Sequence, residues 1–389
     1  MIVAVPKETF TGECRVAITP PRLGSLIKAG FEVRIEAGAG VAAGFADATY
    51  QERQAVVIAD RGSLLAEADV VLQVRTSGAN PERARQDLPF FKPGTVIIGL
   101  AEPLTQRDAI EAFAGCGAVL LAMELIPRIS RAQSMDALSS MASLSGYKAV
   151  LLAVNYLPRI CPMMMTAAGT ITPAKVLVIG AGVAGLQAVA TARRLGAAVS
   201  AYDVRPAVKE QILSLGAKFV ELPLETKDAQ SVGGYAKEQS AQQQRRQREL
   251  MASVVRESDV VISTAAVPGK KAPVLITAEM VRTMKSGSVI VDLAAASGGN
   301  CELTRPEETL EVGGVKLLGP INLPSTVAYH ASELYSNNVC NLLLHLTKSG
   351  RVVLDDADQI THETLVTHHG QVVNTLVRAA WGLAPLPRA

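Results

Sequence analysis

A glycine-rich segment at residues 180–185, with the sequence Gly-Ala-Gly-Val-Ala-Gly, directly follows a short apolar run at residues 175–179. The spacing G-x-G-x-x-G between an expected strand and an expected helix is typical of a turn that binds the pyrophosphate of a dinucleotide. The first glycine allows a tight turn, the second lets the backbone approach the phosphates, and the third lets the helix pack closely on the strand. The helix N-terminus then offers N–H groups and a positive partial charge to the phosphate oxygens. We therefore expect dinucleotide binding here, through Gly180, Gly182, Val183, Ala184 and Gly185; the alternative is a turn whose glycines serve packing alone.

An acidic residue, Asp203, stands 23 residues after Gly180, at the end of the next expected strand. A carboxylate at this place accepts hydrogen bonds from the ribose of the adenosine half. It would also repel the 2′-phosphate of NADP, so NAD is the favoured cofactor, although Arg205 could neutralise that phosphate. Alternatively, Asp203 caps the turn at Arg205-Pro206. The expected cofactor-binding set also contains Val204, Arg205 and Ala265.

All five histidines lie at or after position 330, far along the sequence from the glycine-rich turn. Oxidation of a hydroxy or amino acid needs a general acid or base, most often histidine, so this placement disfavours such chemistry, with a Lys or Asp base as the alternative. Hydride transfer between two nicotinamide rings needs only positioning and exclusion of water. Residues 128–139 supply polar side chains that could hold a carboxamide and a ribose: Arg128, Gln133, Asp136 and Ser139. The alternative is an ordinary helix start, with Ser134 as the N-cap and Asp136 in the first turn.

A pair of glycines next to a tyrosine, Gly233-Gly234-Tyr235, lies between an expected strand and a Gln- and Arg-rich helical stretch. Paired glycines make a hinge, and tyrosine gives a loop an amphipathic tip. We expect Gly234 and Tyr235 to belong to a lid over the nucleotide. Alternatively, the tyrosine packs on its own helix in a solvated loop.

Two series of alternating β-branched runs and helix-like stretches must position these residues. The first series occupies residues 2–123 and the second begins at residue 175. Such alternation is typical of parallel strands joined by helical crossovers. The sequence therefore predicts an α/β fold with two Rossmann-like, doubly wound parallel-sheet domains, linked by long helices near residues 134–156 and 325–346. Because no third series of strands follows, we expect the first domain to be discontinuous (residues 1–140 and 325–389) around an NAD(H)-binding domain at residues 141–324.

The composition limits the class of protein further. With 38 Lys and Arg against 36 Asp and Glu in 389 residues, the formal net charge is +2, which argues against nucleic-acid binding. The five cysteines form no C-x-x-C motif and no close pair, so we expect reduced thiols and no metal site. The N-terminus lacks the pattern of a signal peptide, and no apolar run reaches the about 20 residues of a membrane span. We therefore expect a cytoplasmic globular protein without direct membrane insertion.

Taken together, these segments resemble the NAD(H)-binding component, or domain I, of proton-translocating NAD(P) transhydrogenase, in the same superfamily as alanine dehydrogenase. The resemblance covers nearly the whole chain and implies that Arg128, Gln133, Asp136 and Ser139 approach the nicotinamide and its ribose. It also implies that Tyr235 lies in a loop that closes over the nucleotide. The matching segments are Pro6-Lys7-Glu8 and residues 13–20, 126–136, 162–169, 180–185, 233–236, 268–270 and 272–273.

The chain departs from alanine dehydrogenases at the positions of their substrate chemistry. Where those enzymes have a catalytic histidine in a Leu-His-Leu-Ala segment, this chain reads Ile98-Gly99-Leu100-Ala101, and Arg75 stands for their substrate-binding lysine. They also have an Asp shortly before a Gly-Gly pair, where this chain has residues 294–297, Ala-Ala-Ala-Ser. The resemblance therefore implies hydride exchange with NADP on a partner component; an alanine-dehydrogenase-like enzyme and a non-catalytic NAD sensor are the alternatives.

The resemblance also implies partners. In many relatives the chain continues into transmembrane helices, whereas this sequence ends at Ala389, so we expect the membrane-spanning subunit to be a separate polypeptide. An NADP-binding beta subunit would supply the second coenzyme. The family implies a homodimer, held at the cytoplasmic face of the inner or plasma membrane through these partner subunits.

Overall fold

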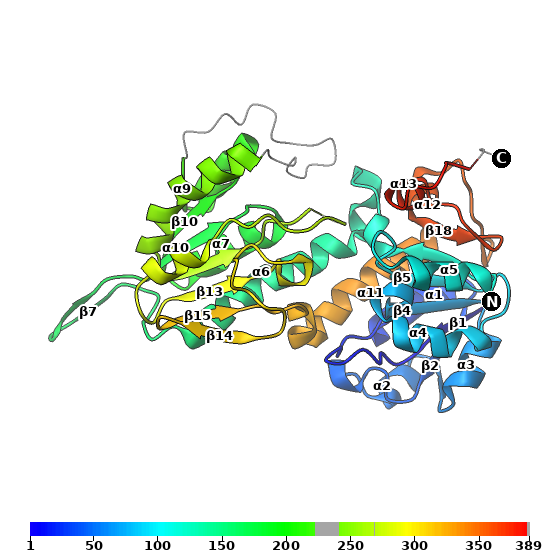
Figure 1. Cartoon of the computed structure of the whole chain (residues 1–389). Helices are drawn as coiled ribbons and strands as arrows, with labels where there is room; N and C mark the ends of the chain where they lie inside the picture. Colours follow the sequence, from blue (N-terminus) through cyan, green and yellow to red (C-terminus); the bar gives the residue numbers. More distant parts are fainter. Residues whose placement is uncertain (222–240, 268, 387–389) are drawn as a thin grey trace. The chain divides into compact units, whose positions relative to one another are not determined.

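A computed structural model describes residues 1–221, 241–267 and 269–386 (Figure 1). The chain divides into two compact units, Met1–Met141 with Pro324–Ala389 (unit 1) and Ala142–Leu323 (unit 2). The domain boundaries expected from the sequence fall next to the limits of these units. That each unit folds as a separate domain stays a prediction.

Unit 1 contains an eight-stranded sheet in the order β19-β18-β6-β5-β4-β1-β2-β3. Its first six strands along the chain are parallel, and two strands from the C-terminal segment extend one edge in antiparallel fashion. These strands are β1 (Ile2–Val5), β2 (Glu32–Glu36), β3 (Val56–Ile58), β4 (Val70–Arg75), β5 (Val96–Leu100), β6 (Val119–Ala122), β18 (Leu365–His368) and β19 (Gln371–Val372).

Helices of unit 1 come from both parts of the chain. On one face of the sheet, Leu65, Ile110, Phe113 and Val377 pack against buried strand residues such as Ile97. These side chains belong to helices α3, α5 and α13, because apolar residues at helical spacing form one buried stripe on each. The helices are α1 (Pro20–Lys28), α2 (Asp47–Gln51), α3 (Arg61–Glu67), α4 (Pro81–Asp87), α5 (Arg107–Gly115), α11 (Ala328–His345), α12 (Gln359–Thr364) and α13 (Thr375–Ala380).

Unit 2 contains a seven-stranded sheet in the order β11-β10-β9-β12-β13-β15-β14, parallel except for the edge strand β14. Its strands are β9 (Lys175–Ile179), β10 (Ala198–Tyr202), β11 (Lys218–Phe219), β12 (Val260–Ser263), β13 (Val289–Asp292), β14 (Thr309–Val312) and β15 (Val315–Leu318). Its helices are α6 (Ala137–Tyr156, which begins in unit 1), α7 (Val183–Arg194), α8 (Lys209–Ser214), α9 (Ala241–Glu257) and α10 (Ala278–Thr283).

The alternation of side chains along β9 explains the two layers of helices on this sheet. Val176 and Val178 lie in the core shared with residues of α6, α7 and α8. Leu177 and Ile179 lie in the core shared with residues of α9 and α10. Because both faces are covered, the strand is apolar along nearly its whole length, as expected for a buried parallel strand.

Both sheets therefore have a doubly wound arrangement in which the chain moves outward in opposite directions from a central pair of strands. That pair is β1 and β4 in unit 1, and β9 and β12 in unit 2. In such sheets, ligands bind in the crevice at the carboxyl ends of the central strands, where the order reverses. The fold class predicted from the sequence is confirmed. Each unit has one such crevice where a ligand could bind.

One helix in the described residues, α6, is long and apolar enough to cross a membrane by length and composition alone. This is weak evidence for a span, because the core helix of a water-soluble protein passes the same test. Ala149, Val150 and Ala153 of α6 are buried in the core of unit 2. The helix begins at Ala137 rather than at residue 134, because residues Ser130–Met135 form a 3-10 helix.

Two antiparallel hairpins were not expected from the sequence. One, β16 (Thr347–Lys348) with β17 (Arg351–Val352), follows α11. The other, β7 (Met164–Thr166) with β8 (Gly169–Ile171), projects from unit 2 with every residue exposed (Figure 1).

Candidate functional site

The glycine-rich turn begins where β9 ends. Ile179 pairs with Tyr202 on one side and with Ser263 on the other, so Gly180 emerges between the residues that follow β10 and β12. Gly180 has a positive φ of 92°, and a Cβ built on it would lie 2.8 Å from Oγ1 of Thr264. The Thr264 hydroxyl donates a hydrogen bond to the Gly180 carbonyl oxygen (2.9 Å). Both the backbone conformation and the available space therefore require glycine here.

Gly182 and Gly185 have opposite surroundings. A Cβ at Gly182 would meet nothing within 4 Å, whereas a Cβ at Gly185 would lie 1.8 Å from the carbonyl oxygen of Gly180. Gly182 is the N-cap residue of α7 and makes no side-chain capping bond, so the first N–H groups of the helix are left for another acceptor. Open space in front of a helix N-terminus suits a pyrophosphate group.

Asp203 lies beside this turn and accepts four hydrogen bonds. Its Oδ2 accepts from the Ala181 N–H (2.7 Å) and from Nη2 of Arg205 (2.8 Å). Its Oδ1 accepts from the Arg205 N–H (2.8 Å) and Nε (2.9 Å). Hydrogen bonding to Asp203 raises the pKa of Arg205. The carboxylate thus holds the glycine-rich turn and also caps the turn at Arg205. Capping of that turn is the alternative role considered from the sequence, and ribose binding stays a prediction.

A cavity of about 170 Å³ lies next to the turn, within unit 2. Thr264, Leu293 and Pro320 contribute to it from segments that follow β12, β13 and β15, which are neighbouring strands. Six of its eight lining residues are apolar, so a group bound there would be shielded from water. The lining residues are Ala142, Ser145, Ala184, Thr264, Leu293, Pro320, Ile321 and Leu323.

Ala265, one of the expected cofactor-binding residues, is held at both its backbone groups by Asn300. Oδ1 of Asn300 accepts from the Ala265 N–H (3.0 Å), and its Nδ2 donates to the carbonyls of Ala265 (2.8 Å) and Pro273 (2.9 Å). The buried Asp292 in turn accepts from the N–H of Asn300 (2.8 Å) and from Oγ of Ser263 (3.0 Å). Asn300 was missed by sequence reasoning because its contact with Ala265 spans 35 residues and leaves no local pattern.

Val204 follows Asp203 directly and packs, partly buried, against the core on the α9 and α10 face. Gly234 and Tyr235, expected to form a lid, lie outside the described residues. Among the described residues, no group of three or more His, Cys, Asp or Glu is arranged to hold a metal ion.

The residues expected at the reacting half of the cofactor lie in or next to the first turn of α6, in unit 1. Asp136 accepts hydrogen bonds from the N–H of Ser139 (2.8 Å, at Oδ1) and from its hydroxyl (2.5 Å, at Oδ2). Asp136 is therefore the N-cap of α6, so the alternative in which Ser134 caps the helix and Asp136 lies in its first turn is wrong in that detail. A role of these residues at the cofactor stays a prediction. Arg128 and Gln133 are exposed side chains on the preceding segment.

This preceding segment is anchored to the C-terminal segment of unit 1. The Ser134 carbonyl accepts hydrogen bonds from Nδ2 of Asn338 (2.9 Å) and of Asn341 (3.2 Å), both on α11. Arg131 pairs with Asp358 (2.7 Å), which His345 also contacts (2.8 Å). Although burial opposes ionisation, hydrogen bonds from His345, Thr361 and Arg131 lower the pKa of Asp358. The contacts from Asn338, Asn341 and Asp358 join the segment to residues more than 200 positions away and hold it in place before Asp136.

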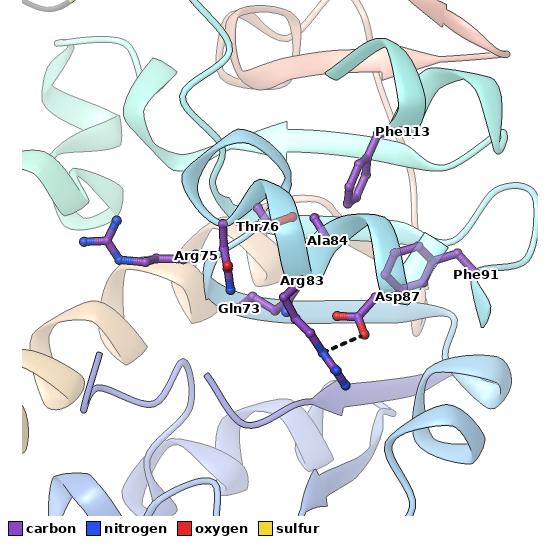
Figure 2. Close-up of a pocket in the computed structure, with 9 residues that line it drawn as sticks. Gln73, Arg75, Thr76, Arg83, Ala84, Asp87, Phe91 and Phe113 are labelled. Carbon is purple, nitrogen blue, oxygen red and sulfur yellow. Dashed lines mark ion pairs between the residues drawn. The ribbon is translucent and has the colours of Figure 1, made fainter. Parts of the chain in front are cut away.

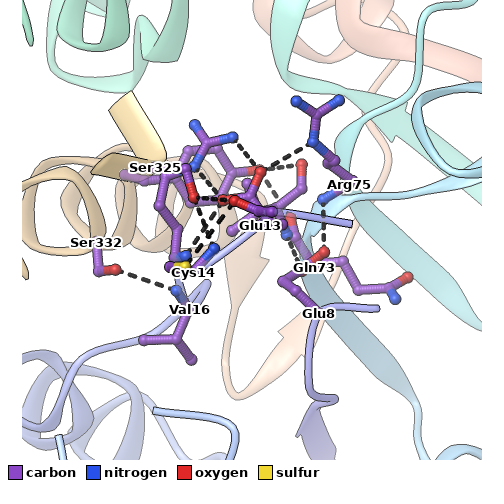
Figure 3. A network of polar contacts seen from close by, with 12 residues as sticks. Glu8, Glu13, Cys14, Val16, Gln73, Arg75, Ser325 and Ser332 are labelled. Carbon is purple, nitrogen blue, oxygen red and sulfur yellow. Dashed lines mark hydrogen bonds and ion pairs between the residues drawn. The ribbon is translucent and has the colours of Figure 1, made fainter. Parts of the chain in front are cut away.

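The corresponding crevice of unit 1 is filled by the protein's own carboxylates (Figure 3). Glu8, which follows β1, accepts hydrogen bonds from the N–H groups of Val74 (2.6 Å) and Arg75 (3.2 Å) at the end of β4. Glu124 accepts from the N–H of Ala101 (2.9 Å), just after β5. Burial raises the pKa of Glu8 and that of Glu124 to about 7 each.

Two arginines meet a single buried carboxylate in the same crevice. Glu13 accepts from Nε (2.7 Å) and Nη2 (2.6 Å) of Arg15 and from Nε of Arg75 (2.9 Å). Burial raises the pKa of Glu13, but the hydrogen bonds and charges of Arg15 and Arg75 outweigh it and lower the pKa to about 2. Glu13 therefore offsets one of the two positive charges and binds guanidinium N–H groups of both arginines.

A cavity lies beside this network, but its volume is only about 10 Å³, enough for one water molecule (Figure 2). Arg83 and Asp87 form an ion pair on its wall (Nε to Oδ1, 3.4 Å), and the rings of Phe91 and Phe113 contribute the apolar part. A small organic acid does not fit this space. This cavity of unit 1 is therefore much smaller than the cavity beside the glycine-rich turn of unit 2.

Comparisons with known proteins match nearly the whole chain. The chain matches the family models described as "Alanine dehydrogenase/PNT, N-terminal domain" at residues 4–145 and "Alanine dehydrogenase/PNT, C-terminal domain" at residues 149–375. It is 46% identical to the first part of NAD(P) transhydrogenase subunit alpha from Rhodospirillum rubrum, over 96% of this chain and 98% of that protein. The protein of the same name from Rickettsia prowazekii is 42% identical, over 97% of each chain. The crystal structure of transhydrogenase from Sinorhizobium meliloti superposes with a TM-score of 0.86 at 43% identity, over 96% of this chain and 100% of that one.

The chain therefore belongs to the alanine dehydrogenase/PNT family. Alanine dehydrogenases of Halomonas elongata and Bacillus subtilis are 29% and 27% identical to it. Its higher identity to the Rhodospirillum and Rickettsia proteins groups the chain with the NAD(P) transhydrogenase alpha subunits. The resemblance inferred from the sequence is confirmed at the level of the family and of this branch.

Proposed function

We propose that the chain binds NAD(H) in unit 2 and exchanges hydride with NADP(H) held by a partner component, as the NAD(H)-binding subunit of a proton-translocating NAD(P) transhydrogenase. The observation that carries the proposal is the contrast between the two crevices. The crevice of unit 2 has an open glycine-rich turn and a cavity of about 170 Å³, whereas that of unit 1 is filled by Glu8, Glu13 and Glu124. The similarity to transhydrogenase alpha subunits over 96% of the chain supports the same function.

The residues of unit 2 fit a dinucleotide. The N–H groups at the start of α7, in front of Gly182, would hold the pyrophosphate, and Asp203 would accept hydrogen bonds from the adenosine ribose. Val183, Ala184, Val204 and Ala265 would contact the cofactor through their backbone or small side chains. Gly234 and Tyr235 would close over it.

When bound, NAD would supply a nicotinamide ring that accepts or donates the hydride. Arg128, Gln133, Asp136 and Ser139 would orient the ring and its ribose, and they would not have to transfer a proton. The apolar residues that line the cavity of unit 2 would limit the access of water to a group bound there. A site of this kind needs no catalytic histidine, in agreement with the Ile98-Gly99-Leu100-Ala101 segment.

We infer that the chain works in an assembly, since hydride exchange requires a second coenzyme. The expected arrangement is a homodimer that contacts an NADP-binding beta subunit and a membrane-spanning subunit. It would thereby lie peripherally on the cytoplasmic side of the membrane, and proton translocation would belong to the assembly.

Isotope transfer tests the proposed function. The purified chain is mixed with a purified NADP-binding component, NADP⁺ and NADH that carries deuterium at both hydrogen positions of the nicotinamide C4, and the product NADPH is analysed by mass spectrometry. Direct transfer predicts that the deuterium appears in NADPH even in ordinary water. Absence of NADPH, or NADPH without the label, contradicts the proposal.

A second experiment tests alanine dehydrogenase activity, which is the alternative function. The same preparation is incubated with NAD⁺ and L-alanine, without the NADP-binding component, while NADH formation is followed. Because residues 98–101 lack the histidine of the alanine dehydrogenases and Glu13 already binds Arg15 and Arg75, we expect no NADH. Steady NADH formation would favour an alanine dehydrogenase instead.

A further inference from the structure

We propose that Gly146, in the middle of α6, is a positioning residue for the nucleotide-binding turn, because its missing side chain lets α6 contact the backbone of Ala184. The inference deepens the proposed function and rests on it. The fingerprint motif itself gives no indication of this residue.

The contact between the two helices is one of backbone on backbone. A Cβ built on Gly146 would lie 2.0 Å from the carbonyl oxygen of Ala184, 2.8 Å from its carbonyl carbon and 3.0 Å from its Cα. Backbone atoms cannot move aside as the end of a flexible side chain can, so any side chain at position 146 must separate α6 from α7. By contrast, a Cβ on Gly24, within α1, would meet nothing within 4 Å.

Glycine in a helix interior is disfavoured relative to alanine, so its presence needs a packing reason. Ala142, Gly146, Ala149 and Ala153 share one face of α6, at the helical spacing of four, three and four residues. Ala149 and Ala153 lie in the core together with Ala188 of α7. The small residues therefore allow a close approach along this face, and Gly146 stands where that face meets the first turn of α7.

Ala184 makes this contact relevant to ligand binding. It belongs to the glycine-rich motif and lies in the first turn of α7, whose N–H groups are the proposed phosphate donors. Ala184 also lines the cavity of unit 2 together with Ala142 and Ser145 of α6. A displacement of α6 would therefore shift the phosphate-binding backbone and one wall of the cavity at the same time.

The test compares Gly146→Ala with the matched control Gly24→Ala in the full-length chain. NADH affinity is measured by titration at a temperature at which circular dichroism shows both variants folded. We expect at least a tenfold weaker affinity for NADH in Gly146→Ala and a change below twofold in Gly24→Ala. In the isotope-transfer assay, the KM for NADH should rise by a similar factor with kcat within about threefold of the unmodified chain.

A merely structural role would lower the melting temperature of Gly146→Ala and leave its NADH affinity unchanged, which would overturn the proposal. If Gly146→Ala does not fold, Ala142→Leu serves as the second variant, because it places bulk on the same face of α6 toward the cavity. An NADH affinity within twofold of the unmodified chain for a folded Ala142→Leu would also overturn it. Failure of the unmodified chain to bind NADH would instead contradict the proposed function, so the two failures are distinguishable.

Discussion

Among the described residues, Arg205 donates three of the four hydrogen bonds that Asp203 accepts, and the two side chains form a partly buried ion pair at the tip of β10. The remaining bond comes from the Ala181 N–H in the glycine-rich turn. The guanidinium group therefore neutralises a carboxylate of its own chain rather than standing free for a 2′-phosphate. This pairing favours NAD over NADP and makes the preference testable.

Replacing Asp203 with asparagine should weaken NADH binding and reduce discrimination against NADPH. The change removes a charge-assisted hydrogen-bond acceptor, each worth about 1.5–3 kcal/mol, and leaves Arg205 without its charged partner. We expect a roughly tenfold or greater loss of NADH affinity and a smaller loss, or a gain, for NADPH. Fluorescence titration of both nucleotides measures the ratio, and Asp47→Asn in unit 1 is the control. An unchanged ratio would show that Asp203 does not face the ribose.

Much of the fold could be predicted from the sequence because apolar runs and their breaks are local signals. The strand at residues 175–179 and the turn at residues 180–185 are examples, and their parallel neighbours follow from the two series. Helix α4 was missed because its sequence, Pro-Glu-Arg-Ala-Arg-Gln-Asp, has no apolar stripe. The β7–β8 hairpin was missed because its turn, at Ala167-Ala168, lacks the usual glycine or asparagine.

The site was predicted less completely because several of its contacts are long-range. Asp136, and not Ser134, caps α6, because residues Ser130–Met135 form a 3-10 helix before it. The Ser134 carbonyl in that segment binds Asn338, 204 residues away. Asn300 reaches Ala265 only after the chain has passed through α10 and β13. The filled crevice of unit 1 depends on carboxylates from two separate segments, Glu8 and Glu13 after β1 and Glu124 after β6, which no single motif records.

Arg128→Ala should slow hydride transfer and leave NADH binding nearly unchanged. The side chain is exposed on unit 1, outside the glycine-rich turn, so its loss removes orientation of the reacting half and not of the adenosine half. We expect at least a tenfold lower single-turnover rate with the NADP-binding component, and an NADH affinity within about threefold. Arg53→Ala, another exposed arginine of unit 1, should match the unmodified chain. A full transfer rate for Arg128→Ala would remove this residue from the reacting site.

Two substitutions of Asp136 can separate its structural role as the N-cap of α6 from its proposed role in hydride transfer. Asparagine is about as good an N-cap as aspartate, whereas alanine loses the cap and costs about 1 kcal/mol of helix stability. If the charge of Asp136 orients the reacting half, Asp136→Asn and Asp136→Ala should both slow hydride transfer, but only Asp136→Ala should unfold at a lower temperature. Transfer rates that track melting temperature across the two variants would indicate a cap alone.

Asn300→Ala should destabilise unit 2 and weaken NADH binding together. The change leaves the N–H and carbonyl of Ala265 and the carbonyl of Pro273 without their partner. An unpaired buried group costs about 1–3 kcal/mol, and these partly buried groups cost less because water can reach them. We expect a lower melting temperature and a several-fold weaker NADH affinity. Asn155→Ala, which changes an exposed asparagine of α6, should alter neither. Thermal unfolding with and without NADH measures both effects. A variant that is destabilised but binds NADH with full affinity would show that Asn300 does not hold the Ala265 segment for nucleotide binding.

The carboxylates of unit 1 predict how stability depends on pH. For Glu8 and Glu124 the folded pKa is about 7, above the value of 4.5 for a free side chain, so the folded state binds these protons more tightly than the unfolded state. Their contribution is therefore fully present below about pH 4.5 and is lost as the pH rises to about 7, by about 1–3 kcal/mol for each group. Glu13 acts in the opposite sense, because its folded pKa is about 2: its contribution is present above about pH 4.5 and is lost as the pH falls toward 2.

Chemical denaturation at a series of pH values separates these groups. Glutamine resembles the protonated carboxyl, so Glu8→Gln and Glu124→Gln should each flatten the decline in the free energy of unfolding between about pH 4.5 and 7, and the double variant should flatten it most. Glu52→Gln, at an exposed position, should leave the profile unchanged. Neither substitution should alter NADH binding, since both carboxylates lie in unit 1 and bind backbone N–H groups at the ends of β4 and β5. A decline that persists in the double variant would mean that these two carboxyls titrate normally, and a loss of NADH affinity would mean that the filled crevice of unit 1 serves the nucleotide site after all.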